Sequence, residues 1–242
     1  MKKLLLILLV ATVVFAGEQV NMNQKVFGSL LKKAQQGDAR SQFALGGMYY
    51  QGIITTKDPK KAAQMYQKAA DQGYVKAMFN LAVMYHKGDG VEKSNEKAVV
   101  LFKKASEAGD NKSAIHLADI YYRGHGVDKD YDKAFVLYKQ VADAGYPMAQ
   151  YKVAMMYKKG KGTQKNIEKA KDYLSRSAMQ SCSESQYALG KMYLEGDGIA
   201  RNKKEAEDLL KDAYINGKME AKTLLDQEDW LAAPQDATLP EE

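Results

Sequence analysis

The sequence predicts an all-α protein, an α/α solenoid of five 36-residue helix-turn-helix repeats closed by capping half-repeats. Three residue registers, each repeating at a constant step of 36 positions, predict this fold class. Because one short repeat cannot bury its own apolar face, such copies stack into a continuous core. The registers are Tyr49, Tyr85, Tyr121, Tyr157 and Tyr193; Ala62, Ala98, Ala134, Ala170 and Ala206; and Gly52, Gly88, Gly124, Gly160 and Gly196.

The first helix of each repeat is predicted from a small-x3-Leu-small-x2-Tyr pattern. In the second repeat the pattern is Ala77, Leu81, Ala82 and Tyr85, whose spacing places them on one helical face. Gly88 follows Tyr85, as expected for a glycine that ends a helix in the left-handed conformation. The small residues predict that neighbouring helices approach closely, with leucine and tyrosine filling the space between them.

The second helix begins after a turn that contains another glycine in every repeat but the first, where Ile54 stands. A short polar residue follows, and its side chain is suited to accept a free backbone N–H at the start of a helix. We expect these helices to end at Gly73, Gly109, Gly145, Ser181 and Gly217. The predicted N-caps are Asp58, Ser94, Asp130, Asn166 and Asn202.

The same registers continue beyond the repeats, which occupy residues 37–217, and predict a capping helix at each end. Leu30 and Ala34 match second-helix positions, so residues 17–36 are expected to form an N-terminal capping helix. Ala221 and Leu225 match first-helix positions, so residues 218–231 are expected to form a C-terminal one. Residues 232–242, with their acids and prolines, are expected to be a disordered acidic tail.

Residues 1–16 have the three parts of a secretory signal peptide. Lys2 and Lys3 precede an apolar run from Leu4 to Phe15, and a small residue, Ala16, follows it. A membrane-spanning helix needs about 20 apolar residues, which is more than this run contains. We therefore expect cleavage after Ala16, no stable membrane span after cleavage, and a secreted or periplasmic location.

The composition argues against several function classes. The net charge is +6, but acids and bases are interspersed, whereas a nucleic-acid partner favours clustered bases. Cys182 is the only cysteine, so no disulfide can form within the chain, and we expect an unpaired thiol and a monomer. His86, His116 and His125 are scattered and lack metal-ligand spacing, so we expect no metal and no cofactor.

No catalytic residue is predicted. The Ser-x-x-Lys motif of serine β-lactamases occurs as Ser29 with Lys32 and as Ser94 with Lys97, but the Ser-Asp-Asn and Lys-Thr-Gly elements are missing. Ser94 stands in the N-cap register, and Ser29 lies in the middle of the predicted capping helix. Structural roles therefore explain both serines.

The repeat pattern is similar to that of a known family. Most positions of the family pattern, which runs from Ala-x3-Leu-Ala through Gly-x-Gly-Val and Lys-Ala to a closing glycine, occur within residues 77–109. Over about residues 22–229 the chain resembles the Sel-one-like repeats, relatives of the tetratricopeptide repeats. The resemblance implies an adaptor that holds partner proteins or peptides on a right-handed superhelix.

One exported branch of that family, the helicobacter cysteine-rich proteins, is similar in period and signal peptide. It implies an alternative function: a cell-wall or β-lactam binding protein with weak β-lactamase activity. That branch carries a cysteine pair in each repeat, and this chain has no cysteine at the equivalent positions. These positions are Ala70 with Met78, Ser106 with Ala114, Ala142 with Gln150, and Ala178 with Gln186.

A binding groove is predicted if the first helices line a concave wall, as they do in tetratricopeptides. The residues beside the packing face mix cations and aromatic rings, which suits a peptide or protein segment with acidic side chains or a free carboxylate. The candidates are Arg40, Phe43, Tyr50, Lys76, Phe79, His86, Lys87, Lys112, Tyr122, Arg123, Tyr151, Lys158 and Lys159. In the alternative interpretation, the rings are buried spacers between helices and the lysines only keep the protein soluble.

The fifth repeat has Glu184 and Glu195 at the corresponding places, so the basic character is expected to fade toward the C-terminus. We thus predict an exported scaffold or adaptor that binds an unidentified protein or peptide through this groove. A structural or secreted effector role that depends on the convex face is the third possibility.

Overall fold

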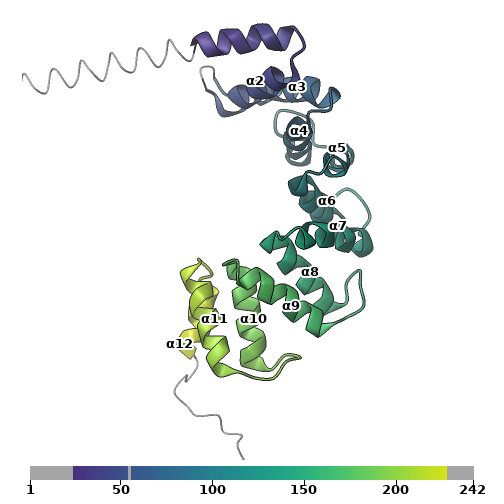
Figure 1. The fold of residues 1–242 in the computed structure, drawn as a ribbon. Helices are drawn as coiled ribbons and strands as arrows, with labels where there is room; N and C mark the ends of the chain where they lie inside the picture. The colour runs from purple at the N-terminus through teal and green to yellow at the C-terminus, as the bar shows by residue number, and fades with distance from the viewer. Residues whose placement is uncertain (1–23, 54–55, 228–242) are drawn as a thin grey trace, which may run out of the picture. The chain divides into compact units, whose positions relative to one another are not determined.

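The computed structural model describes residues 24–53 and 56–227, and no strand occurs in that part of the chain. The chain divides into two compact units, unit 1 up to Asp128 and unit 2 from Lys129 onward. Figure 1 labels the helices of both units. The predicted signal peptide and acidic tail, and the outer ends of both capping segments, lie outside the described residues.

Unit 1 contains a helix over residues 24–35 followed by two complete helix pairs and the first helix of a third. Consecutive helices pack against one another, as the stacked-repeat prediction requires. The helix over residues 24–35 takes the place of the predicted N-terminal cap. The labelled helices are α2 (Ala39–Gln51), α3 (Pro59–Asp71), α4 (Val75–Lys87), α5 (Asn95–Glu107) and α6 (Asn111–Arg123).

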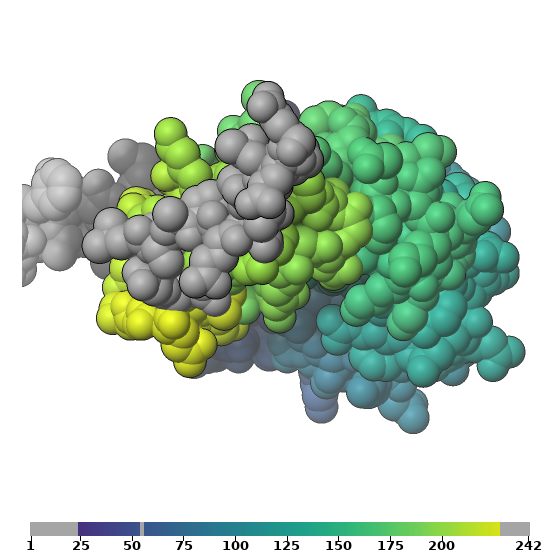
Figure 2. All heavy atoms as spheres, turned by 90° about the horizontal axis from the view of Figure 1, so that it is seen from below, coloured from purple at the N-terminus to yellow at the C-terminus, as the bar shows by residue number. Residues whose placement is uncertain are grey.

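Unit 2 continues the pattern with a second helix, two further pairs and a short final helix. The final helix, α12, packs on α11 in the place of the predicted C-terminal cap, and its spheres lie at the surface of this unit (Figure 2). The all-α solenoid prediction is confirmed. The helices are α7 (Tyr131–Asp143), α8 (Pro147–Lys159), α9 (Ile167–Ala178), α10 (Ser183–Glu195), α11 (Lys203–Ile215) and α12 (Glu220–Gln227).

The second helices begin and the first helices end where the sequence predicts. Each predicted N-cap accepts the backbone N–H of the residue three positions on; Asn166, for example, accepts that of Lys169 at 2.8 Å. Such caps typically contribute about 1 kcal/mol each. Each first helix ends at a left-handed glycine, such as Gly88 at φ 74°. These local signals recur at a step of 36 residues.

The starts of the first helices are a feature that the registers did not reveal. Asp38 and Asp110 cap α2 and α6 by accepting the N–H of the serine three positions on, each at 2.7 Å. The hydrogen bond to Ser41 lowers the pKa of Asp38. Tyr74, Tyr146 and Cys182 stand at the equivalent positions of α4, α8 and α10 without a side-chain cap. The lone cysteine is thus a buried N-cap residue.

The core depends on small residues that let the helices come close. Ala62, Ala98 and Ala170 are fully buried, so their methyl groups are the contact surface between helices. Gly46 has no room even for a methyl group, because a Cβ there would lie 2.6 Å from the ring of Tyr66. A hydrogen at this position is therefore what allows the tyrosine ring to pack on α2.

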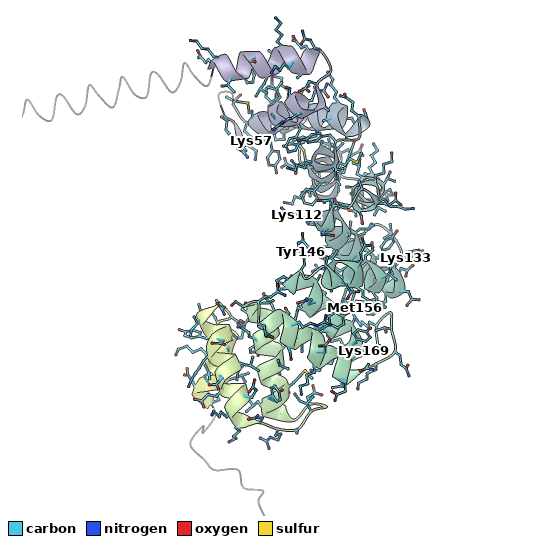
Figure 3. The ribbon with its side chains drawn as sticks, in the orientation of Figure 1. Lys57, Lys112, Lys133, Tyr146, Met156 and Lys169 are labelled. Carbon is cyan, nitrogen blue, oxygen red and sulfur yellow. The ribbon has the colours of Figure 1, made fainter. Side chains whose placement is uncertain are left out.

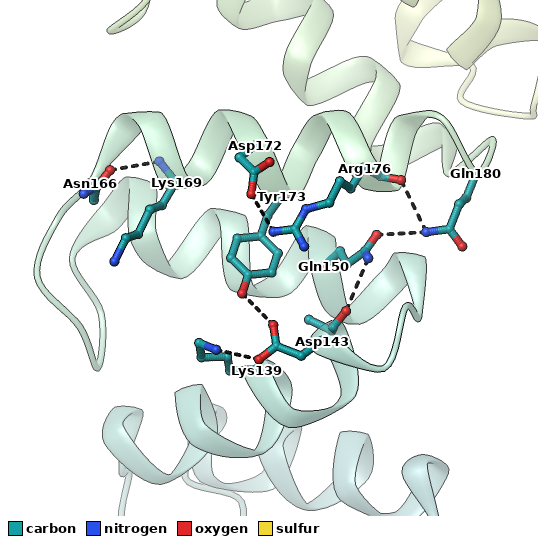
Figure 4. Close-up of polar contacts among 10 residues, drawn as sticks. Lys139, Asp143, Gln150, Asn166, Lys169, Asp172, Tyr173, Arg176 and Gln180 are labelled. Atoms are coloured by element: carbon teal, nitrogen blue, oxygen red, sulfur yellow. Dashed lines mark hydrogen bonds and ion pairs between the residues drawn. The ribbon is translucent and has the colours of Figure 1, made fainter.

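Buried glutamines occupy positions where the cysteine-rich branch would have a disulfide. Gln150 donates from its amide nitrogen to the carbonyl of Ala142 at 3.3 Å and accepts from Gln180 at 3.0 Å (Figure 4). Gln186 makes the same two bonds with Ala178 and Asn216. In the first repeat Gln42 makes them with Ala34 and Gln72. An amide tie thus joins the helices where the family resemblance places a pair of thiols.

Candidate binding site

The predicted cations of unit 1 lie at both ends of its first helices. Arg40, Lys76 and Lys112 are the second residues of α2, α4 and α6, whereas Lys87 and Arg123 are the last residues of α4 and α6. All five are exposed, and no ion pair joins any of them to another residue that the structure describes. Figure 3 marks Lys112 at its helix end. We call these five residues the first-helix cations.

The equivalent positions of unit 2 carry other residues. Lys159, the last residue of α8, is exposed, but Met148 and Glu184 replace the cations at the helix starts. Glu195 ends α10 and pairs with Lys191 at 3.4 Å. The excess of positive charge at the first-helix ends therefore belongs to unit 1.

Two predicted groove aromatics are engaged in packing between helices. The half-buried ring of Phe43 lies 5.1 Å from that of Tyr74 and 5.7 Å from that of Tyr66. Phe79, also half-buried, lies 5.9 Å from Phe102 and 5.4 Å from His116. These two rings are placed as the spacer interpretation describes, and each is only partly exposed to solvent.

Five other candidates are half-buried. Tyr122 and Tyr151 each interact with a neighbouring group, as do Tyr50, His86 and Lys158. Tyr50, His86 and Lys158 share a register with Tyr122, and these three reach the turn of the following repeat. Their partners show what this register does.

Tyr50, His86 and Lys158 each contact the residue 39 positions later, with a different chemistry in each case. Tyr50 donates its hydroxyl to Asp89 at 2.8 Å, and this bond raises the pKa of the tyrosine. The ring of His86 stacks on that of His125 at 6.2 Å. Lys158 forms an ion pair with Asp197 at 2.7 Å, which lowers the pKa of that carboxyl. This register therefore fastens one repeat to the next, a role that the sequence analysis missed.

The three histidines all lie in unit 1 and have structural partners. The Nδ1 atom of His86 lies 2.8 Å from the side-chain oxygen of Asn95. His116 stacks on Phe102 with ring centroids 5.2 Å apart, and its burial against the neighbouring rings lowers its pKa. No group of three metal-binding side chains occurs among the described residues.

The Ser-x-x-Lys motif at Ser94 has the structural role that its register predicts. Ser94 caps α5 by accepting the N–H of Lys97 at 3.2 Å and donates its hydroxyl to Glu96 at 2.9 Å. The ammonium group of Lys97 lies 5.2 Å from the centre of the Tyr85 ring rather than beside the serine. Ser29 is exposed on the helix over residues 24–35. Within the described ranges, no helix is long and apolar enough to cross a membrane.

A family model described as the Sel1 repeat matches five consecutive segments of this chain. The segments are residues 39–74, 75–110, 111–146, 147–182 and 183–217. They follow the helix pairs closely, each beginning at the start of a first helix. A search of curated proteins gave no match.

Solved structures with the same fold include two of high similarity. One is c5321, a protective antigen of uropathogenic Escherichia coli strains with an SLR fold, at 32% identity and a TM-score of 0.78. The match covers 82% of this chain and 43% of that one, so this chain spans less than half the length of that relative. The other is a Sel1 repeat protein from Oxalobacter formigenes, at 28% identity and a TM-score of 0.79, with 88% of each chain covered.

A cysteine-rich relative is also found. Helicobacter pylori cysteine rich protein B is 25% identical over 52% of this chain and 93% of that one, with a TM-score of 0.40. That score is too low to transfer any property of the relative to this chain.

Proposed function

Because the chain belongs to the Sel1 repeat family, whose members generally mediate protein–protein interactions, we propose that it is an exported scaffold. It binds an acidic segment of a partner protein along the first-helix ends of unit 1. The proposed role is binding without catalysis, in keeping with Sel1 repeat proteins, which are typically non-enzymatic scaffolds.

The observation that carries this proposal is the set of first-helix cations. Stacked repeats place equivalent positions in a row, so Arg40, Lys76 and Lys112 follow one end of the first helices and Lys87 and Arg123 follow the other. None has an ion-pair partner within the described residues, so their charge is available to a ligand. Such patches steer acidic partners and increase the rate of association.

The surface between these cations is rigid. Phe43 and Phe79 are fixed by rings on neighbouring helices, and Tyr50 is held by its bond to Asp89. Side chains that are already ordered lose little entropy on binding. A binding face with packed aromatic rings and exposed cations suits a peptide that supplies carboxylates.

Export is part of the proposal and is supported by the signal-peptide pattern of residues 1–16. The description of the Escherichia coli relative as a protective antigen is consistent with it. The test is the N-terminal sequence of the protein recovered from the cell envelope or the medium. A chain that begins at Gly17 supports export, and a chain found only in the cytoplasm with residues 1–16 intact contradicts it.

The binding face is tested by affinity capture from an envelope extract with residues 17–242. A variant carrying Lys87→Glu and Arg123→Glu is expected to lose the partner. A control with the same charge change, Lys103→Glu with Lys204→Glu on exposed second-helix positions, is expected to retain it. Equal capture by all three proteins contradicts the proposed face.

A further inference from the structure

We propose that unit 1 has a second docking surface, on its second helices, that binds a peptide segment with a large apolar side chain flanked by carboxylates. It is formed by two adjoining hollows between α3, α4 and α5, with volumes of about 650 Å³ and 530 Å³. Gln67 and Tyr85 line both hollows, so the two form one surface feature, the α3–α5 hollow. Pockets in this size range accommodate an aromatic side chain and its neighbours.

The hollow lies where the second repeat lacks the amide tie of the first, fourth and fifth repeats. The third repeat, with Ala114 at the first-helix position, lacks the tie too. Met78 occupies the position of Gln42, Gln150 and Gln186, and a thioether cannot form their hydrogen bonds. Ala108 stands where Gln72 supplies the second amide in the first repeat. No amide pair therefore spans the helices at this point, and Met78 lines the hollow instead.

The floor of the hollow is apolar. Met78, Leu81 and Tyr85 of α4 contribute to it, and Leu101 lies on the α5 side. Val100 stands at its edge with 53% of its surface exposed, although it is a β-branched apolar residue on a helix with many charges. Methionine floors adapt to different apolar partners because the side chain is flexible and polarisable.

The rim has an uncompensated positive charge. Four lysines line the two hollows, and none of them is joined by an ion pair to another described residue. The two carboxylates on the rim are engaged by neutral donors, since Asp71 accepts from Gln67 at 2.7 Å and Glu96 accepts from Ser94 at 2.9 Å. A partner with carboxylates around an apolar anchor complements this combination. The four lysines are Lys60, Lys68, Lys97 and Lys104.

This surface is separate from the one proposed above, because the first-helix cations do not line it. The two surfaces can therefore be tested independently. Variants of the first-helix cations leave the hollow intact, and variants of the hollow leave the first-helix ends intact.

The test measures binding of a labelled synthetic peptide, Glu-Glu-Trp-Leu-Glu-Glu, to the full chain by fluorescence anisotropy at low salt. We expect saturable binding. Replacing the glutamates with glutamines, or the Trp-Leu pair with serines, is expected to weaken it about tenfold or more, because each removes one half of the complementarity. Absence of saturable binding, or equal binding of the three peptides, overturns the proposal.

Matched variants locate the site. Lys97→Glu with Lys104→Glu is expected to weaken binding by about tenfold and Val100→Asp by about fivefold. The controls are Lys103→Glu, on the same helix outside the hollow, and Val136→Asp, at the equivalent position of the third repeat with 65% exposure. Both controls are expected to bind within about twofold of the unaltered chain.

Two results would overturn this location. One is that the hollow variants and their controls bind alike while circular dichroism shows every variant folded. The other is that binding is lost in Lys87→Glu with Arg123→Glu but kept in the hollow variants, which assigns the peptide to the first-helix ends.

Discussion

Unit 1 and unit 2 are built from the same repeat but combine ring packing and polar bonds in different proportions. In unit 1 aromatic rings connect the helices, as where Phe79 packs against Phe102 and His116. In unit 2 more of the contacts between helices are polar bonds. Tyr173 of α9, for example, donates its hydroxyl to Asp143 of α7 at 2.7 Å (Figure 4). The cations at the first-helix ends follow the same division, since those of unit 1 have no ion-pair partner among the described residues.

Under the proposed function, the two units use one repeat for two purposes. Ring packing buries apolar surface and requires no charged side chain, so the charged groups of unit 1 are left available for a ligand. In unit 2 charged and polar groups are consumed internally: Lys139 and Tyr173 both bond to Asp143, and Lys158 pairs with Asp197. The surface of unit 2 is consequently less suited to an acidic partner.

The largest expected effect is from Phe102→Ala in unit 1. Phe102 is fully buried, so its truncation is expected to cost about 3–5 kcal/mol of folding free energy. Hydrogen exchange is expected to show lost protection in unit 1 and little change in unit 2, because repeat stability is largely a nearest-neighbour property. Leu174 stands in the same register in unit 2 and is also fully buried. Leu174→Ala is therefore expected to reduce protection in unit 2 and to change unit 1 little. Equal loss of protection in both units after either change would mean that the units unfold together.

Gly46→Ala tests whether the close helix packing in unit 1 depends on the absence of a side chain at this position. Its Cβ would lie 2.6 Å from the Tyr66 ring, so we expect a loss of about 1–3 kcal/mol despite the higher helix propensity of alanine. At the next residue, a Cβ on Gly47 would have the Tyr66 hydroxyl as its nearest neighbour, at 3.8 Å. Gly47→Ala is therefore expected to be neutral or stabilising by up to about 1 kcal/mol. Urea denaturation distinguishes the two, and similar midpoints would contradict the packing argument.

Tyr173→Phe tests the polar bonding of unit 2. The change removes the hydroxyl that donates to Asp143 and is expected to cost about 1 kcal/mol, with lost protection confined to unit 2. Burial and the bond to Asp143 raise the pKa of Tyr173, as expected for a hydroxyl that donates to a carboxylate. Tyr187→Phe, at a half-buried ring whose hydroxyl bonds to no other described residue, is the control. A Tyr173→Phe chain as stable as the control would show that the bond contributes nothing.

The smallest effect concerns pH and the ion pair between Lys158 and Asp197. The bond to Lys158 lowers the pKa of Asp197 in the folded chain. The pair therefore stabilises the fold above the unfolded carboxyl pKa of about 3.9, and this contribution is lost as the pH falls through the lower folded value. Because Asp197 is exposed, we expect less than about 1 kcal/mol.

A Lys158→Met chain provides the comparison for that effect. Urea titrations between neutral and acid pH are expected to show a smaller pH dependence for this variant than for the unaltered chain. An identical pH dependence in the two proteins would show that the pair has no influence on stability.

The sequence predicts the local structure well, because its signals act within a few residues. The N-caps such as Asn166 and the left-handed glycines such as Gly88 are confirmed, since each forms its bond within its own turn. The starts of the first helices were not predicted, although Asp38 and Asp110 carry the same chemistry. They occur in the first and third repeats only, so they do not form a constant 36-residue register.

The candidate site was harder to predict because it depends on contacts between repeats. In the sequence, Phe43 and Phe79 occur near cations. Only the structure shows that their rings pack against those of Tyr74 and Phe102. The link from Tyr50 to Asp89 crosses 39 residues, and its equivalents use different chemistries, so no conserved residue type marks the register. The α3–α5 hollow lies where an amide pair is missing, and a missing pair leaves no motif in the sequence.

The amide ties have a consequence for how the chain matures. A disulfide forms only when an oxidant removes electrons from two thiols, and it is lost to a reductant. The bonds of Gln42, Gln150 and Gln186 form as the helices meet and require no partner enzyme or redox environment. The repeats can therefore assemble in a reducing or an oxidising compartment, and thiol reagents will not loosen them.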